Sequence, residues 1–330
     1  MQPGGSRGGQ DIASLAGGYD VVEHALGTLL VLIGEVHDDP TAHELELGIL
    51  QECFQRMRAS RSLHLSLEMF ETDVQRVIDE YTRGIISERD MMVDGRAWMN
   101  YPSDYRKMVE FAKEHGIPVI AANAPRRFYE QSDFLSSLIL AFRYISVVGN
   151  RGMSSLDQLS SSSRSFLPPL PVPPASGPYQ LKFTQQMQLM QQEVAAEGKR
   201  NSEGKSSSTS SLSRQDKGAQ GQAAGEEGAA CPYIGWSAER SRFMLEAQNL
   251  WDATMAHSIA QILNGGGDLS GGGGGGGGGG EKLTRGGVKD GKAPLVIHVT
   301  GKFHCEERLG IPEHLHRYAP HAKVMVVGET

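Results

Sequence analysis

Two short segments of the sequence place a histidine three residues after a glycine. Gly34-Glu35-Val36-His37 lies near the start of the chain, and Gly301-Lys302-Phe303-His304 repeats the spacing near its end. Each follows an apolar run typical of a buried strand, and ligands of open parallel sheets bind outside the carboxyl ends of the strands. Glycine permits a sharp turn there, so that the imidazole can project into a crevice. Either segment alone could equally be an ordinary turn whose polar side chains bond one another.

A glutamate gives a third polar group at the same predicted edge. Glu68 directly follows the apolar run Leu63–Leu67. Two histidines and a carboxylate are a common set of ligands for a divalent metal. The sequence therefore predicts a metal site built from His37, Glu68 and His304, with Glu35 as a further candidate ligand. The alternative is that Glu68 pairs with an arginine such as Arg126 and that the histidines are turn residues.

The segment Ala121–Arg127 runs off the end of another predicted strand. Asn123 can hold a turn through its side chain. Arg126 or Arg127 could bind a carboxylate with two parallel hydrogen bonds, for example a haem propionate. An internal salt bridge from Arg126 to Glu68 or Glu35 explains the arginine equally well.

An aromatic segment, Trp98-Met99-Asn100-Tyr101-Pro102 with Tyr105, precedes a predicted helix. Trp98 and the two tyrosines could stack on a flat ligand, and a tyrosinate can ligate haem iron. Aromatic clusters of this kind are also common in protein cores, so Trp98, Tyr101 and Tyr105 are candidate ligand contacts with a structural alternative.

The elements that would position these residues alternate along the chain. Apolar runs rich in branched residues predict buried strands, and apolar residues recurring every three or four positions predict helices between them. This order predicts an α/β fold with a central, mostly parallel sheet and helices on both faces. The predicted strands are Leu29–Ile33, Leu63–Leu67, Pro118–Ala122, Tyr144–Val148, Leu295–Val299 and Val324–Val327, and the predicted helices lie around 47–57, 105–112, 179–194 and 243–263.

Two segments lack the apolar residues that folding requires. Residues 195–230 are rich in Ser, Gly, Gln and Lys, and residues 264–292 are dominated by glycine. Neither can bury enough surface to offset its ordering entropy, so both are expected to be flexible, low-complexity insertions. The chain is thus predicted to have a flexible N-terminus at 1–18 and one α/β domain at 19–330, interrupted by these insertions.

Composition excludes several classes of protein. A formal net charge of −7 and no dense basic stripe argue against nucleic-acid binding. No apolar run reaches the ~18 residues of a membrane span, and three widely spaced cysteines form no disulfide framework. Residues 1–10 have no apolar signal core, which predicts a cytosolic protein if the chain begins at its natural start.

Taken together, these residues resemble the ChaN-like haem-binding uptake proteins of the Tiki superfamily, in a plant or algal type of branch. The resemblance covers most of the chain outside the insertions. It rests on Ile33–Asp38, Leu67–Phe70, Trp98–Tyr101, Ala121–Arg126, Gln248, Trp251-Asp252, Met255-Ala256, Gly301–His304 and Gly310–Pro312.

The resemblance implies a haem-binding protein of iron or haem uptake, or of tetrapyrrole handling. Haem or another small tetrapyrrole would be its partner, a homodimer is an open alternative to a monomer, and a chloroplast location follows by analogy. Tiki-type relatives resemble metal-dependent proteases that use the positions of His37, Glu68 and His304. A metal-dependent hydrolase is therefore the alternative function, and an inactive interaction domain is a third.

Overall fold

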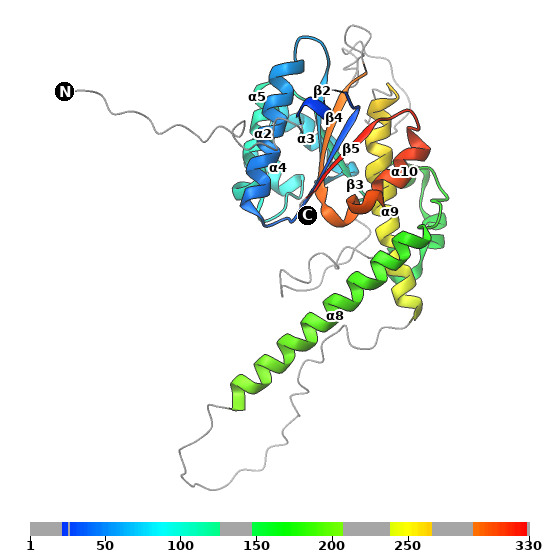
Figure 1. Cartoon of the computed structure of the whole chain (residues 1–330). Coiled ribbons are helices and arrows are strands. Elements are labelled where there is room, and N and C mark those ends of the chain that lie inside the picture. The colour runs from blue at the N-terminus through cyan, green and yellow to red at the C-terminus, as the bar shows by residue number, and fades with distance from the viewer. Residues whose placement is uncertain (1–21, 26, 126–146, 207–237, 266–292, 329–330) are drawn as a thin grey trace, which may run out of the picture.

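A five-stranded parallel sheet forms the centre of the computed structural model, which describes residues 22–25, 27–125, 147–206, 238–265 and 293–328 (Figure 1). The strands stand in the order β3-β2-β4-β1-β5. Each adjacent pair is parallel, as predicted. The strands are β1 (Leu30–Glu35), β2 (Leu63–Glu71), β3 (Val119–Asn123), β4 (Leu295–Gly301) and β5 (Val324–Gly328).

Helices cover both faces of this sheet, as the strand pattern predicted (Figure 1). Alternate residues of a strand point to opposite faces: Val31 and Ile33 pack in one core cluster, whereas Leu30 and Leu32 pack in the other. The first cluster is covered by α2 (Pro40–Met57), α3 (Gln75–Thr82), α4 (Glu88–Asp94) and α5 (Arg106–Glu114), and the second by α9 (Ala238–Leu263) and α10 (Ile311–Tyr318).

The sheet order determines which chain segments meet at the carboxyl edge. β4 lies between β1 and β2, with Glu35 opposite Gly301 and Leu67 opposite Val299. The two Gly-x-x-His turns therefore lie at the level of Glu68. Glu68 follows the last residue of β2 that pairs with β4, but it lies within β2, which continues to Glu71 instead of ending at Leu67 as predicted. Residues that are 233 positions apart in sequence, such as Gly301 and Glu68, become direct hydrogen-bond partners here.

One predicted strand is wrong in its described part. Val147 and Val148, the end of the predicted strand Tyr144–Val148, begin helix α6 (Val147–Arg151). Val148 packs in a third core cluster with Leu156 and with Ala247 and Leu250 of α9. A short apolar run fits a buried helical turn as well as a strand, and only its packing partners separate the two.

Helix α8 (Gly177–Ser206) extends away from the sheet (Figure 1). It contains the helix predicted at 179–194 but continues to Ser206, so residues 195–206, predicted as the start of an insertion, are helical. The rest of that insertion lies outside the described residues, as do residues 266–292 and 1–18. Between α6 and α8 lie the short helices η6 (Met153–Gln158) and α7 (Ser161–Arg164).

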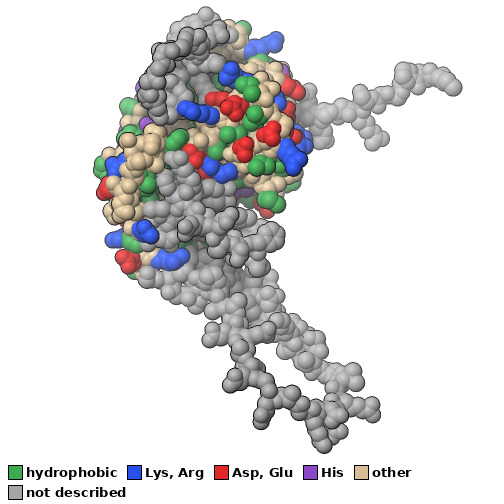
Figure 2. Space-filling view, turned by 180° about the vertical axis from the view of Figure 1, so that it is seen from behind, with side chains coloured by type: hydrophobic (Ala, Val, Ile, Leu, Met, Phe, Trp, Pro, Cys, Tyr) green, Lys and Arg blue, Asp and Glu red, His purple; other side chains and the backbone are tan. Residues whose placement is uncertain are grey.

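Charges of both signs are interspersed on the surface of the described residues. The face shown in Figure 2 carries Lys and Arg side chains between Asp and Glu side chains. Several of the charged groups pair, as in Arg106 with Glu88 at 2.5 Å. In the part of the chain that the structure describes, no helix is long and apolar enough to cross a membrane.

Candidate functional site

The first Gly-x-x-His turn packs directly on the second. A Cβ atom on Gly34 would lie 2.8 Å from Cys305 Sγ and 3.0 Å from Lys302 Cα, so only glycine lets the two turns approach this closely. After Gly34, Glu35 is buried, and Asp39 caps α2 by accepting a hydrogen bond from the Thr41 amide. The turn thus links the end of β1 to the start of α2, with Glu35 fixed by burial and Asp39 by its hydrogen bond.

His37 lies at the surface end of this turn. Its Nδ1 lies 2.8 Å from Glu35 Oε1, and 42% of its side chain is exposed. The Trp98 ring packs against it edge-on, with ring centroids 4.7 Å apart. A Cβ atom on Gly301 would lie 2.9 Å from His37 Nε2, so this nitrogen lies directly over the second glycine. Nδ1 is therefore used for anchoring, and Nε2 faces the end of β4.

His304 has the same arrangement in a buried setting. Its Nδ1 lies 2.5 Å from Asp252 Oδ1 on α9, and only 6% of its side chain is exposed. Its Nε2 lies 3.5 Å from Glu68 Oε1 and 3.3 Å from the Gln248 amide nitrogen. Both histidines thus place Nδ1 on a carboxylate, which is the orientation that metal-binding imidazoles use to direct Nε2 to the ion.

Glu68 lies between the two histidines. Thr300 Oγ1 and the Gly301 amide both donate to its Oε2, at 2.6 and 2.8 Å. Burial raises the pKa of this carboxyl, but the neighbouring His304 and His37 and these hydrogen bonds outweigh burial and lower it. Glu68 is therefore held as a carboxylate. In the described residues its partners are these groups, whereas Arg126, its alternative partner, lies outside them.

The carboxylates around the two histidines raise the pKa values of both imidazoles. Burial lowers the pKa of His304, but Glu68 and Asp252 raise it to about 9. The pKa of His37 is also raised, because Glu35 and Glu68 outweigh its desolvation. His37, Glu68 and His304 therefore form one electrostatic unit at the carboxyl edge, where the sequence predicted that they would meet. Their role as metal ligands stays a prediction.

The three aromatic candidates have different settings, and two of them, Trp98 and Tyr105, lie beside His37. Trp98 contacts His37, whereas Tyr101 and Tyr105 are buried in the π-helical turn η3 (Tyr101–Tyr105). Tyr105 Oη donates to Glu35 Oε1 at 2.5 Å. Burial raises the pKa of both phenols, and Glu35 raises that of Tyr105 further. Both tyrosines are thus kept protonated and enclosed, which opposes their predicted use as tyrosinate ligands of iron.

The segment after β3 is only partly described. Asn123 Oδ1 accepts a hydrogen bond from the Ala124 amide at 2.8 Å, so its side chain holds the turn, as its residue type predicted. Arg126 lies outside the described residues, and its predicted contact with a propionate stays a prediction.

A second polar cluster, which sequence reasoning missed, lies buried behind the first turn. His43 and Glu46 of α2 meet Glu35: His43 Nδ1 lies 3.2 Å from Glu35 Oε2 and 3.1 Å from Glu46 Oε2. Burial and Glu35 raise the pKa of Glu46 to about 8, whereas both carboxylates raise that of His43 to about 10, against its desolvation. The spacing of three between His43 and Glu46, on one helix face, was the only available signal.

The residues that anchor His304 were also missed as functional residues. Asp252 and Gln248 are four positions apart on α9, a spacing that places both on one helix face. Their long distance from His304 in the sequence gave no reason to group them with it.

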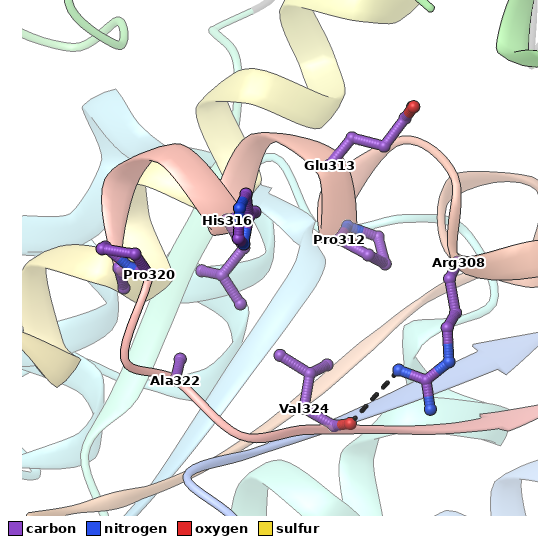
Figure 3. A pocket seen from close by; sticks show the side chains of 9 residues that line it. Arg308, Pro312, Glu313, His316, Pro320, Ala322 and Val324 are labelled. Atoms are coloured by element: carbon purple, nitrogen blue, oxygen red, sulfur yellow. Dashed lines mark hydrogen bonds between the residues drawn. The ribbon is translucent and has the colours of Figure 1, made fainter.

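A cavity of about 290 Å³ lies between α10 and β5 (Figure 3), lined among others by Arg308, Glu313 and His316. It shares no residue with the cluster at the sheet edge.

Comparison with known proteins agrees with this architecture. Residues 21–133 and 135–271 match the family described as haem-binding uptake, Tiki superfamily, ChaN, and the chain belongs to this family. A solved structure of ChaN of Campylobacter jejuni, which describes cofacial haem binding, superposes with a TM-score of 0.52 at 14% identity, covering 94% of this chain and 84% of that chain. At this identity the superposition supports the fold alone. No curated protein sequence matches the chain.

Proposed function

We propose that the protein binds haem at the carboxyl edge of the sheet, with His37 as an axial donor to iron. Membership of a haem-binding family supports the ligand. The observation that carries the proposal is the setting of His37: its side chain is 42% exposed, and its Nδ1 is anchored on Glu35. An anchored imidazole with a second nitrogen available is a suitable axial ligand.

The surroundings of His37 supply an apolar contact for a porphyrin. Val36 is 37% exposed and Met99 is 91% exposed, both large fractions for apolar side chains. Trp98, which precedes Met99, packs on the His37 ring. A flat, mostly apolar ligand would cover these side chains, and such exposed apolar groups often mark a binding site. Arg126 remains the proposed partner of a propionate.

The wider role follows from the ligand. A haem-binding member of an uptake family would serve haem or iron uptake, or tetrapyrrole handling, as a monomer or a homodimer. The plant or algal branch and the chloroplast location rest on the resemblance of sequence motifs and stay predictions.

Haem titration tests the proposal directly. We expect a shift of the Soret band on adding haem to the wild type, a loss of affinity of at least tenfold in His37→Ala, and a smaller loss in Met99→Ser or Arg126→Ala. His316→Ala, a histidine of the separate cavity, is the matched control and should bind as the wild type does. Equal haem affinity in the wild type and His37→Ala would contradict the proposal.

A metal-dependent hydrolase is the second candidate, and one observation favours it. Both His37 and His304 hold Nδ1 on a carboxylate. Nε2 of His304 lies 3.5 Å from Glu68 Oε1, and Nε2 of His37 lies over Gly301. The donor set of two imidazoles and one carboxylate fits a catalytic divalent metal, which would lower the pKa of a bound water. Within this site, Glu35 and Asp252 orient the imidazoles, and Thr300 and Gly301 hold Glu68 ionised.

The two candidates require the same nitrogen, His37 Nε2, so they can be separated. If the site holds a catalytic metal, Mn²⁺ or Co²⁺ should support peptide cleavage and should reduce haem binding by competition. His304→Ala should abolish the cleavage but leave haem binding unchanged. Cleavage of peptides without any binding of haem at micromolar concentration would make the hydrolase the better assignment.

A further inference from the structure

We propose that Glu35, His43 and Glu46 form a second site, for one buried divalent cation of the first transition series. One ligand atom from each side chain can be chosen so that all lie within 4.8 Å of one another. All three residues are buried, and Glu46 is completely enclosed. The site lies behind the first Gly-x-x-His turn and is separate from the set His37, Glu68 and His304.

The orientation of His43 is that of a metal ligand. Its Nε2 lies 3.2 Å from the carbonyl oxygen of His37 and can donate to it. With the proton on Nε2, the lone pair of Nδ1 faces Glu35 Oε2 and Glu46 Oε2, at 3.2 and 3.1 Å. Donor atoms about 3 Å apart are suitably spaced to share an ion with bonds of ~2.0–2.2 Å. The carbonyl thus plays the part of the outer partner that fixes a ligating imidazole.

Two buried carboxylate oxygen atoms give a further indication of a ligand. Glu46 Oε1 accepts no hydrogen bond, and neither does Glu35 Oε2, whose neighbour is His43 Nδ1. Buried carboxylate oxygens almost always have a partner, since an unpaired one is unfavourable in an apolar interior. Glu35 Oε2 lies within the cluster, because it is 3.2 Å from His43 Nδ1. A cation there would supply the missing partner.

Charge balance also favours a divalent ion. Two carboxylates and a neutral imidazole are neutralised by one charge of +2. Without the ion, the buried carboxylates of Glu35 and Glu46 both lie against the single imidazole of His43. Because one donor is an imidazole nitrogen, Zn²⁺, Mn²⁺ or Fe²⁺ suits the set better than Mg²⁺ or Ca²⁺, which prefer oxygen ligands alone.

Glu35 would connect the two sites. Its Oε1 contacts His37 Nδ1 and Tyr105 Oη, whereas its Oε2 faces His43. An ion on Oε2 would fix the carboxylate that orients His37. The buried ion would therefore have a structural and positioning role, while ligands bind at the exposed edge.

The test uses the full chain with the edge site disabled. His304→Ala, purified from cells supplied with Zn²⁺ or Mn²⁺, should retain about one equivalent of metal by mass spectrometry after dialysis. Adding Glu46→Gln, which keeps the shape but removes a charge, should lower the metal affinity 10- to 100-fold. Adding Glu44→Gln, an exposed glutamate of the same helix paired with Lys107, is the matched control and should change nothing.

Two outcomes would overturn the proposal. One is a His304→Ala protein without bound metal, and the other is equal metal content with and without Glu46→Gln. If Glu46→Gln does not fold by circular dichroism, Glu46→Asp keeps the charge, and Zn²⁺ should then raise the melting temperature of the wild type more than that of the aspartate variant. An equal rise in both would also reject the site. None of these results depends on haem binding, which His37→Ala tests separately.

Discussion

The two Gly-x-x-His turns share a sequence pattern but differ in how their histidines are held. His37 takes its carboxylate partner from its own turn, two residues away, whereas His304 takes Asp252 from α9, 52 residues away. His37 is partly exposed and His304 is buried, with 42% and 6% of their side chains exposed. The same motif therefore places a partly exposed histidine after β1 and a buried histidine after β4.

Because the two histidines are anchored differently, they can have different roles in one site. A histidine anchored within its own turn keeps its position even where solvent reaches it, so it can accept a ligand that arrives from outside. A histidine anchored by a distant helix is fixed only when the helix is packed, and it couples the site to the stability of the domain. Variants that remove the anchor of His304 should therefore cost more stability than variants that remove His37.

The largest expected effect is the removal of the distant anchor. Asp252→Ala should lower the free energy of unfolding by about 3 to 5 kcal/mol, because it removes the carboxylate that contacts Nδ1 of buried His304 and leaves Glu68 as its ionic partner. It should also weaken divalent-metal binding 10- to 100-fold. Urea unfolding and metal titration measure both. Glu239→Ala, at an exposed position of the same helix, is the control. If Asp252→Ala loses as little free energy of unfolding as Glu239→Ala, the distant anchor of His304 does not stabilise the domain.

A second prediction concerns how the stability of the protein depends on pH through His298, a residue of β4. His298 is buried, its Nδ1 lies 2.9 Å from Ser66 Oγ, and burial lowers its pKa to about 4. Since the folded state disfavours its protonation, stability is full above the unfolded pKa of about 6.5 and falls as the pH drops toward 4. The loss should be roughly 3 kcal/mol.

The variant His298→Asn isolates this contribution. Chemical unfolding at pH 7, 5.5 and 4 should show a shallower decline for His298→Asn than for the wild type. Parallel declines in the two proteins would show that other groups, not this histidine, set the acid sensitivity.

Substitution of Gly34 and of Gly301 compares the stability cost of crowding each of the two turns. On Gly34, a Cβ atom would meet the Lys302 backbone at 3.0 Å and Cys305 Sγ at 2.8 Å; on Gly301, it would meet the His37 ring at 2.9 Å. Backbone cannot move aside easily, whereas a partly exposed ring can. Gly34→Ala should therefore cost about 1 to 3 kcal/mol of stability, and Gly301→Ala less.

For ligand affinity the order of the two glycine variants should be reversed, with the larger loss in Gly301→Ala. By displacing His37, Gly301→Ala should lower haem and metal affinity more than its small stability loss suggests. Thermal unfolding and haem titration of both variants would check this, and a larger stability loss for Gly301→Ala than for Gly34→Ala would refute the reasoning.

The smallest stability effect is expected for the exposed histidine itself. His37→Ala should change the free energy of unfolding by about 1 kcal/mol or less, since it removes one hydrogen bond from Glu35, which keeps Tyr105 as a donor. Differential scanning calorimetry measures the change. A loss as large as that of Asp252→Ala would mean that His37 is as much part of the core as His304.

Much of the architecture could be predicted from the residue pattern. The apolar runs before Gly34 and Gly301 and around Leu63–Leu67 are strands because continuous branched apolar residues suit a sheet covered on both faces. The polar residues at their ends must then lie at one edge, which is why Glu68 could be grouped with two distant histidines. The strand prediction failed at Val147 and Val148, the described end of the run Tyr144–Val148, because a short apolar run carries no reliable period.

What the sequence determined by itself was therefore the class of fold and the residues at the strand ends, since both follow from local periodicity and from the direction of parallel strands. Only the tertiary structure decided which partners those residues have. Asp252 reaches His304, and His43 and Glu46 reach Glu35, through helices whose orientation depends on packing across the whole sheet. It also enclosed Tyr101 and Tyr105, because burial depends on what covers a side chain and not on its type.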